Sequence, residues 1–239
     1  MADYTDMAGH YDLIMESGYY DYEAIVDALD RVDSVAPGSS VLELGAGTGL
    51  ILQRLAARRP DLRLTGVDFT QAMLDIAEVR LATVPGLSLS RQNVVTMAMD
   101  TLYDTAFSYG GVWYFVRGDG ERCSSMISHL RSDADNESGL QQVAAHLPPG
   151  GTLLLGIQSP HHDYTDRVSN GMRYEQRITP IDNGFRKVYS LHDDDLRLME
   201  QTTDYRVYDV DEALALLDKL GFDHVPGAPS RLFEEFRKR

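Results

Sequence analysis

Cysteine is nearly absent from this sequence, since Cys123 is the only one among 239 residues. A single thiol can form neither an internal disulfide nor a cysteine-based metal cluster, and it agrees with a reducing compartment. Long apolar runs are also missing, because no stretch reaches the roughly 18 residues that a membrane-spanning helix requires. The polar, acidic start of the chain shows no basic-then-apolar leader. We therefore expect a cytoplasmic protein.

Positive charge is scarce as well. The chain has 22 Lys and Arg against 37 Asp and Glu, which gives a formal net charge of −15. A surface this acidic repels phosphate backbones and anionic lipids, so we expect no nucleic-acid and no membrane partner. A neutral or cationic small molecule remains a suitable substrate, although solubility alone also explains the charge. With 43% apolar residues, the chain can bury the core of one globular domain.

A glycine-rich turn is the most informative motif. Residues 41–49 read VLELGAGTG, and Asp68 ends the next hydrophobic segment. A buried strand that runs into such a turn and then a helix brings backbone amides close to a nucleoside-type ligand, and a following carboxylate takes its ribose hydroxyls. A dinucleotide fingerprint starting at Gly45 needs glycine at position 50, where the chain has Leu50. Glu43, two places before three alternating glycines, points to a different cofactor.

This pattern resembles the class I, Rossmann-like S-adenosylmethionine-dependent methyltransferases. The specific part of the resemblance spans residues 41–73, and residues 205–222 are similar to bacterial amino-sugar N-methyltransferases and relatives of glycine N-methyltransferase. The resemblance implies S-adenosylmethionine as cofactor and S-adenosylhomocysteine as product. The residues expected to bind the cofactor are Tyr11, Glu43, Gly45, Ala46, Gly47, Asp68, Phe69, Met73, Asn93, Val94 and Ser108.

Strand and helix patterns alternate up to residue 157, which is typical of a parallel sheet with helices on both faces. Residues 173–178, 186–191 and 196–207 instead alternate polar with apolar or β-branched side chains, as antiparallel strands do. We predict an α/β fold: a Rossmann-like, doubly wound, mostly parallel seven-stranded sheet with an inserted small antiparallel β lid. The expected divisions are an N-terminal helical cap over the cofactor (1–40), the cofactor-binding core (41–160), the lid and acceptor region (161–208), and a C-terminal helix and strands that complete the core sheet (209–239).

Three residues are candidates for the transfer itself. His161 and His162 follow the fifth strand directly, and ligand sites in parallel sheets form at the carboxyl ends of strands. Either imidazole has the chemistry of a general base near neutral pH, with Asp163 holding one tautomer. A surface loop with incidental histidines is an equally good interpretation. Tyr109 follows the fourth strand and is expected beside the acceptor. The histidines show no recognisable metal-ligand spacing, so we expect no metal.

The sequence therefore predicts an S-adenosylmethionine-dependent methyltransferase that acts on nitrogen or oxygen of a small molecule, with a secondary-metabolite or amine-type acceptor favoured. The resemblance also implies a homodimer, because the inserted strands can support a dimer in the resembling families. A nicotinamide-dependent oxidoreductase is one alternative, against which Leu50 argues. A non-catalytic S-adenosylmethionine-binding module is another.

Overall fold

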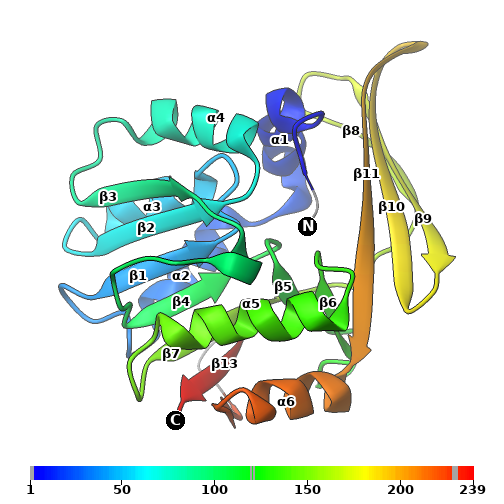
Figure 1. Cartoon of the computed structure of the whole chain (residues 1–239). Coiled ribbons are helices and arrows are strands. Elements are labelled where there is room, and N and C mark those ends of the chain that lie inside the picture. Colours follow the sequence, from blue (N-terminus) through cyan, green and yellow to red (C-terminus); the bar gives the residue numbers. More distant parts are fainter. Residues whose placement is uncertain (1–2, 119, 121, 228–230) are drawn as a thin grey trace.

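The computed structural model describes residues 3–118, 120, 122–227 and 231–239 (Figure 1). The helices are α1 (Ala8–Ile14), α2 (Tyr22–Asp30), α3 (Leu50–Arg58), α4 (Gln71–Leu81), α5 (Asp133–Ala145) and α6 (Val210–Lys219), with a π-helical turn η1 (Met15–Tyr19) and a 3₁₀ turn η2 (Val94–Thr96). The strands are β1 (Ser40–Leu44), β2 (Arg63–Asp68), β3 (Leu87–Arg91), β4 (Thr105–Ser108), β5 (Trp113–Val116), β6 (Ser125–Ser128), β7 (Thr152–Gln158), β8 (Tyr164–Arg167), β9 (Arg173–Ile181), β10 (Gly184–Asp193), β11 (Leu196–Asp209), β12 (Phe222–Val225) and β13 (Phe233–Lys238).

The predicted Rossmann-like core is confirmed. Its sheet runs β3-β2-β1-β4-β7 with all neighbours parallel, and β13 and β12 continue it in antiparallel pairing. Val41 packs into the apolar cluster of α2 and α3, whereas Leu42 and Leu44 pack into that of α5 and α6. Each face of β1 is therefore covered by helices, which explains why the strand is buried along its whole length. Figure 1 shows α5 in front of this sheet and α2 and α3 behind it.

The antiparallel strands form a larger structure than the small lid expected from the sequence. The three predicted strands are β9, β10 and β11, and Asn183 at the turn between β9 and β10 has a φ of 53°. The long segment 110–147 supplies β5 and β6 in addition to α5. β11 pairs with β6, β6 with β5, and β5 with β7, so the lid and the core share one continuous sheet.

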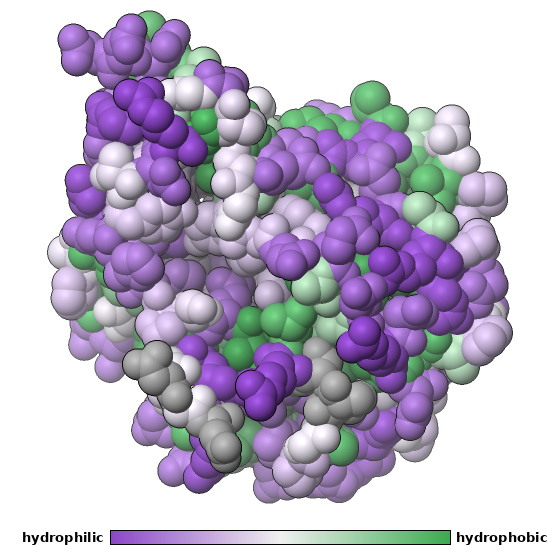
Figure 2. All heavy atoms as spheres, turned by 180° about the vertical axis from the view of Figure 1, so that it is seen from behind, coloured by the Kyte–Doolittle hydropathy of each residue, from purple (hydrophilic) through white to green (hydrophobic). Residues whose placement is uncertain are grey.

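The surface agrees with the acidic composition. Figure 2 shows hydrophilic residues over most of the rear face, with the end of the β10–β11 hairpin standing out from the body of the molecule. Leu196 and Leu198, at the start of β11, are 64% and 37% exposed. Within the described ranges, none of the helices combines the length and apolar character needed to cross a membrane.

Candidate functional site

The glycine turn forms the floor of the site. Gly45 and Gly47 adopt φ values of 76° and 55°, in the left-handed region that side chains with a Cβ disfavour. A Cβ on Gly45 would lie 2.9 Å from the Cα of Gly111 in the loop after β4. The loop after β4 therefore packs closely against the turn, and the helix α3 follows it, with Gly49 as the N-cap and Leu50 as the first helical residue.

Asp68 holds this turn from the neighbouring strand. Its Oδ2 accepts a hydrogen bond from the Gly47 N–H at 2.8 Å, and its Oδ1 accepts one from the Thr70 N–H at 2.8 Å. Each carboxylate oxygen keeps a second lone-pair direction for a ligand hydroxyl. Desolvation by burial raises the pKa of Asp68, and the backbone hydrogen bonds oppose that rise.

Glu43 carries an unsatisfied acceptor. Its side chain is 2% exposed, and within the described part of the chain its Oε2 is buried with no hydrogen-bond partner. It lines a cavity of about 290 Å³ together with Tyr11, Gly45 and Thr48. Burial raises the pKa of Glu43 well above its ordinary value, and the nearby charge of Asp68 adds to this. A donor group of a ligand would satisfy this carboxyl.

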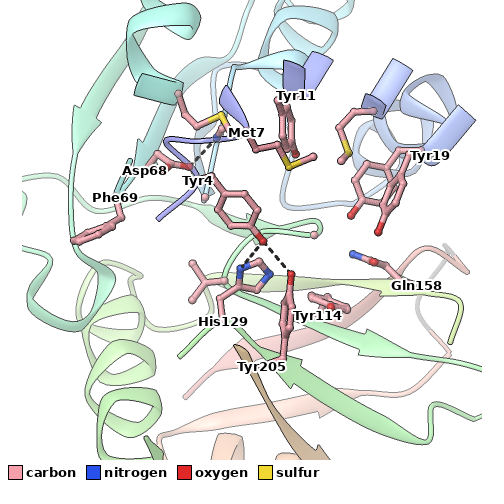
Figure 3. A pocket seen from close by; sticks show the side chains of 18 of the residues that line it. Tyr4, Met7, Tyr11, Tyr19, Asp68, Phe69, Tyr114, His129, Gln158 and Tyr205 are labelled. Atoms are coloured by element: carbon pink, nitrogen blue, oxygen red, sulfur yellow. Dashed lines mark hydrogen bonds between the residues drawn. The ribbon is translucent and has the colours of Figure 1, made fainter. Parts of the chain in front are cut away.

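The main cavity lies between the glycine turn and the antiparallel sheet, and it measures about 850 Å³ (Figure 3). One end, which we call the turn end, is lined by Tyr11, Gly45, Gly47, Asp68, Phe69, Met73, Gln92 and Val94. The other end, which we call the inner chamber, is lined by Tyr4, Tyr19, Tyr20, Tyr114, His129, Gln158, His161, Tyr189 and Tyr205.

Hydroxyl groups connect the walls of the inner chamber. The Oη of Tyr4 lies 2.9 Å from that of Tyr205 and 3.5 Å from Nδ1 of His129, and Tyr205 is 2.7 Å from the hydroxyl of Tyr189. Figure 3 shows Tyr4 reaching down from the N-terminal segment onto His129 and Tyr205. The segment before α1 therefore closes one side of the chamber through side-chain contacts.

The imidazoles of the chamber are neutral at physiological pH. His161 Nε2 lies 2.7 Å from the Oη of Tyr114. Desolvation by burial lowers the pKa of His161 to about 3, and the charge of Lys187 contributes to the same shift. Burial and Lys187 likewise lower the pKa of His129 to about 3. Both rings therefore act as neutral hydrogen-bonding groups in the free protein.

The structure brings most of the predicted site residues together. The main cavity is lined by Tyr11, Gly45, Gly47, Asp68, Phe69, Met73, Val94 and His161. The adjoining small cavity is lined by Glu43, Ala46 and Tyr109, and also by Tyr11 and Gly45.

Three predicted residues lie outside both cavities. Asn93 is half-buried and its side chain accepts the Val95 N–H at 3.0 Å, which caps η2. Ser108 is fully buried, and its hydroxyl accepts the Trp113 N–H at 3.4 Å. His162 is exposed beside a separate cavity near Tyr164.

Apart from His161, the residues that line the inner chamber are not among the predicted site residues. These side chains come from the N-terminal segment, from the loop and strands after β4, and from β10 and β11. A signal was present in the alternation of β10, where Phe185, Lys187, Tyr189 and Leu191 share one face of the strand. The sequence does not show that β11 pairs with β6, and this pairing is what turns that face of β10 toward the chamber.

Residues 42–153 match a protein family described as "Methyltransferase domain". Among curated relatives, an uncharacterized methyltransferase of Bacillus subtilis is 26% identical over 130 residues, which cover 54% of this chain and 61% of that protein. The first three curated relatives are matched over 38%, 61% and 29% of their own length.

Solved structures match nearly the whole chain. An amino pentose methyltransferase from Micromonospora echinaspora, involved in calicheamicin biosynthesis and solved with S-adenosylmethionine bound, has a TM-score of 0.70 at 19% identity and covers 96% of both chains. A sugar N-methyltransferase from a Streptoalloteichus species has a TM-score of 0.70 at 22% identity, with 96% of this chain and 92% of that chain covered. At these identities the structures establish the fold.

The matched segment contains the glycine turn, Asp68 and the strands that carry them. The family match, the fold and the geometry of the glycine turn therefore point to the same part of the chain. Residues 42–153 match a methyltransferase domain, and the chain has the Rossmann-like fold that the resemblance implies.

Proposed function

We propose that this protein transfers a methyl group from S-adenosylmethionine to a nitrogen or oxygen of a small-molecule acceptor. The observation that carries the proposal is the single cavity of about 850 Å³ that joins the turn end to the inner chamber. A donor held over Asp68 and an acceptor in the chamber would lie in one continuous cavity. When bound, the cofactor supplies a sulfonium methyl that is already activated.

The residues at the turn end suit the parts of that cofactor. Asp68 offers free lone pairs to ribose hydroxyls, and the apolar side chains of Phe69, Met73 and Val94 suit a purine ring. The unpaired Oε2 of Glu43 suits the ammonium group of the methionine part, since it is a buried acceptor without a donor. Tyr11 packs over Gly47, with its ring carbon Cε1 3.8 Å from where a Cβ would stand.

Asn93 and Ser108 would act indirectly. Asn93 shapes the backbone before Val94 through its cap of η2, and Ser108 holds the loop that contains Gly111. We therefore propose both as residues that position the lining of the turn end.

The inner chamber would align the acceptor and exclude water. Transfer from an activated sulfonium depends mainly on placing the nucleophile in line with the methyl carbon. Of the predicted catalytic residues, His161 lies in the chamber, and its neutral ring can accept a hydrogen bond from the acceptor. Tyr109 lines the adjoining small cavity instead, where it packs edge-on against Tyr20 with ring centroids 5.4 Å apart.

The proposal is tested by calorimetry with S-adenosylmethionine, S-adenosylhomocysteine, NAD and NADP. We expect the two sulfur nucleosides to bind and the two dinucleotides not to bind. Dinucleotide binding would favour an oxidoreductase, for which the turn lacks glycine at position 50. Binding without transfer of labelled methyl to any compound in an extract of small metabolites would favour a non-catalytic module.

We further propose a cytoplasmic location and a homodimer. The exposed Leu196 and Leu198 on the β11 hairpin offer apolar surface for a second copy. Sedimentation analysis of the wild type and of a Leu196→Glu, Leu198→Glu variant tests the dimer, since a monomeric wild type would exclude it.

A further inference from the structure

Lys187 is buried in the middle of β10 without a counter-charge. Its side chain is 0% exposed. The Nζ donates a hydrogen bond to the Oη of Tyr19 at 2.7 Å, and it lies 4.6 Å from the ring centre of Tyr189 and 5.3 Å from that of Tyr19. Among the residues that the structure describes, no carboxylate forms an ion pair with it. A buried amine held only by a phenol and two aromatic faces is unusual, because lysine is almost never fully buried unless it is paired.

The surroundings of Lys187 disfavour its charged form. Its partners in register are Ile178 on β9 and Thr203 on β11, neither of which carries charge. His129 and His161 are the titratable groups across the chamber that interact with it electrostatically, and both are neutral. Desolvation by burial lowers the pKa of Lys187 to about 7. The amine therefore exchanges a proton near physiological pH.

The inner chamber lacks the group that an ammonium acceptor would need. The side chains described along its wall are tyrosines, two neutral histidines and Gln158, and the only carboxylate lining the main cavity is Asp68 at the turn end. A protonated amine in the chamber would have no carboxylate there to pair with, and Lys187 lies behind Tyr19 in the same wall. Hydroxyl and imidazole groups instead suit an acceptor with a neutral or anionic oxygen.

We propose that the acceptor carries a weakly acidic hydroxyl, of the phenol or enol class, and that Tyr19 and Lys187 form the relay that removes its proton. This inference rests on the proposed methyltransferase function and narrows the acceptor atom to oxygen. Tyr19 lines the chamber and touches the acceptor, whereas Lys187 lies behind it and acts through it.

The proton balance of the relay is simple. A neutral Nζ has a lone pair, so at the same 2.7 Å separation the Tyr19 hydroxyl can turn to donate to it. The acceptor O–H then gives its proton to Tyr19 Oη while the Tyr19 proton passes to the Nζ of Lys187. The acceptor oxygen forms its bond to the methyl carbon, and the carbon–sulfur bond breaks with its electron pair remaining on sulfur. One positive charge is lost at sulfur and one is gained at Lys187. Tyr19 ends neutral, which its environment requires, because burial raises the pKa of this phenol.

Lys187 suits this role better than the two imidazoles. A general base works best when its pKa lies near the operating pH. His129 and His161, with pKa values lowered to about 3 by burial, hold a proton poorly at pH 7. His161 therefore orients the acceptor, and the proton leaves through Tyr19.

The experiment uses the protein saturated with S-adenosylhomocysteine and the probe 4-nitrophenol, whose phenolate is followed by its visible absorption. The variants are Lys187→Met and Tyr19→Phe, and Lys219→Met is the matched control because Lys219 is exposed and pairs with Glu137 at 2.8 Å. We expect the wild type and the control to bind 4-nitrophenolate in preference to benzylamine. Both relay variants should bind it about 10-fold more weakly or worse, since a charge-assisted interaction is lost.

A second readout needs no acceptor. Because the folded-state pKa of Lys187 is depressed, its contribution to stability is present above the unfolded pKa and is lost as pH falls toward 7. The midpoint of urea unfolding should therefore rise between pH 7 and 10 in the wild type, and this slope should be reduced in Lys187→Met. An equal slope in the two proteins would show that Lys187 is not the titrating group and would overturn the relay.

The other outcomes separate the two levels of the proposal. If S-adenosylhomocysteine binds but 4-nitrophenol does not, or if benzylamine binds more tightly, the hydroxyl acceptor is refuted while the methyltransferase function stands. If Lys187→Met keeps full affinity for the phenolate, the relay is refuted. If S-adenosylhomocysteine itself does not bind, the proposed function fails.

Discussion

Replacing Asp68 should weaken cofactor binding far more than it weakens the fold. In Asp68→Ala, a ligand loses an ionised acceptor, and removal of such a contact costs about 1–3 kcal/mol. At about 1.4 kcal/mol for each factor of ten, Kd for S-adenosylmethionine should rise about 5- to 150-fold. The variant also leaves the N–H groups of Gly47 and Thr70 without their 2.8 Å acceptor, which loosens the turn and moves the expected loss toward the upper end of this range.

The cost to the free protein should be smaller. Burial raises the pKa of Asp68, so the ionised side chain is itself held at a cost that the substitution removes. This gain partly offsets the two lost hydrogen bonds. Calorimetric titration gives the affinity, and thermal unfolding gives the stability.

Asp75→Ala is the matched control for this experiment, because Asp75 is exposed on α4 and bonds only to Gln71 among the contacts described for it. We expect its affinity to equal that of the wild type. A folded Asp68→Ala protein with the affinity of the wild type would refute the assignment of Asp68 to the ribose. An equal loss of affinity in Asp75→Ala would show that the overall negative charge of the protein, and not the contact at Asp68, controls cofactor binding.

Four further predictions follow from the same geometry. Gly45→Ala should destabilise the fold by at least about 1–2 kcal/mol, since a left-handed φ is combined with contact against the backbone of Gly111; an unchanged urea midpoint would contradict this. Glu43→Gln should keep or raise stability at pH 7, because the raised pKa marks a costly buried carboxyl, yet it should weaken S-adenosylmethionine binding in calorimetry. His161→Ala should lower the rate of methyl transfer about 100-fold because the acceptor is no longer aligned, and His162→Ala should leave the rate unchanged. If both variants transfer methyl at the wild-type rate, the two histidines belong to a loop with no role in the reaction. Because the folded-state pKa of His161 is depressed to about 3, its contribution to stability is lost as pH falls from 6.5, so His161→Ala should unfold less steeply with acid than the wild type.

The turn end could be predicted from sequence because its determinants are local. Glu43, Gly45 and Gly47 lie at the end of β1 and in the turn that leads to α3, and Asp68 ends the parallel neighbouring strand β2. Such connections follow a small set of backbone geometries, so residue type and spacing carry the information. Met73, which the resemblance assigns to the cofactor site, lines the main cavity from α4.

The inner chamber could not be predicted because its contacts join distant parts of the chain. Tyr4 and Tyr205 are 201 positions apart, and Tyr19 and Lys187 are 168 apart. Neither contact leaves a periodic signal within a window of residues. Ser108 shows that a correct position in the sheet does not ensure access to a ligand. The sequence places it at the end of β4, but its hydroxyl accepts the Trp113 N–H and lies buried under the following loop.

Strand β7 connects the core sheet to the antiparallel strands that form the wall of the chamber. One edge of β7 pairs with β4, and the other pairs with β13 over residues 152–156 and with β5 from residue 156 onward. Rotating the antiparallel strands away from the core would break this ladder, so the pairings hold the wall of the chamber to the core sheet. The N-terminal segment bears no strand and touches the wall through side chains such as Tyr4 and Gln201, whose Nε2 donates to the Asp3 carbonyl at 2.9 Å. The segment before α1 is therefore the part of the chamber wall that can move without breaking a strand pairing.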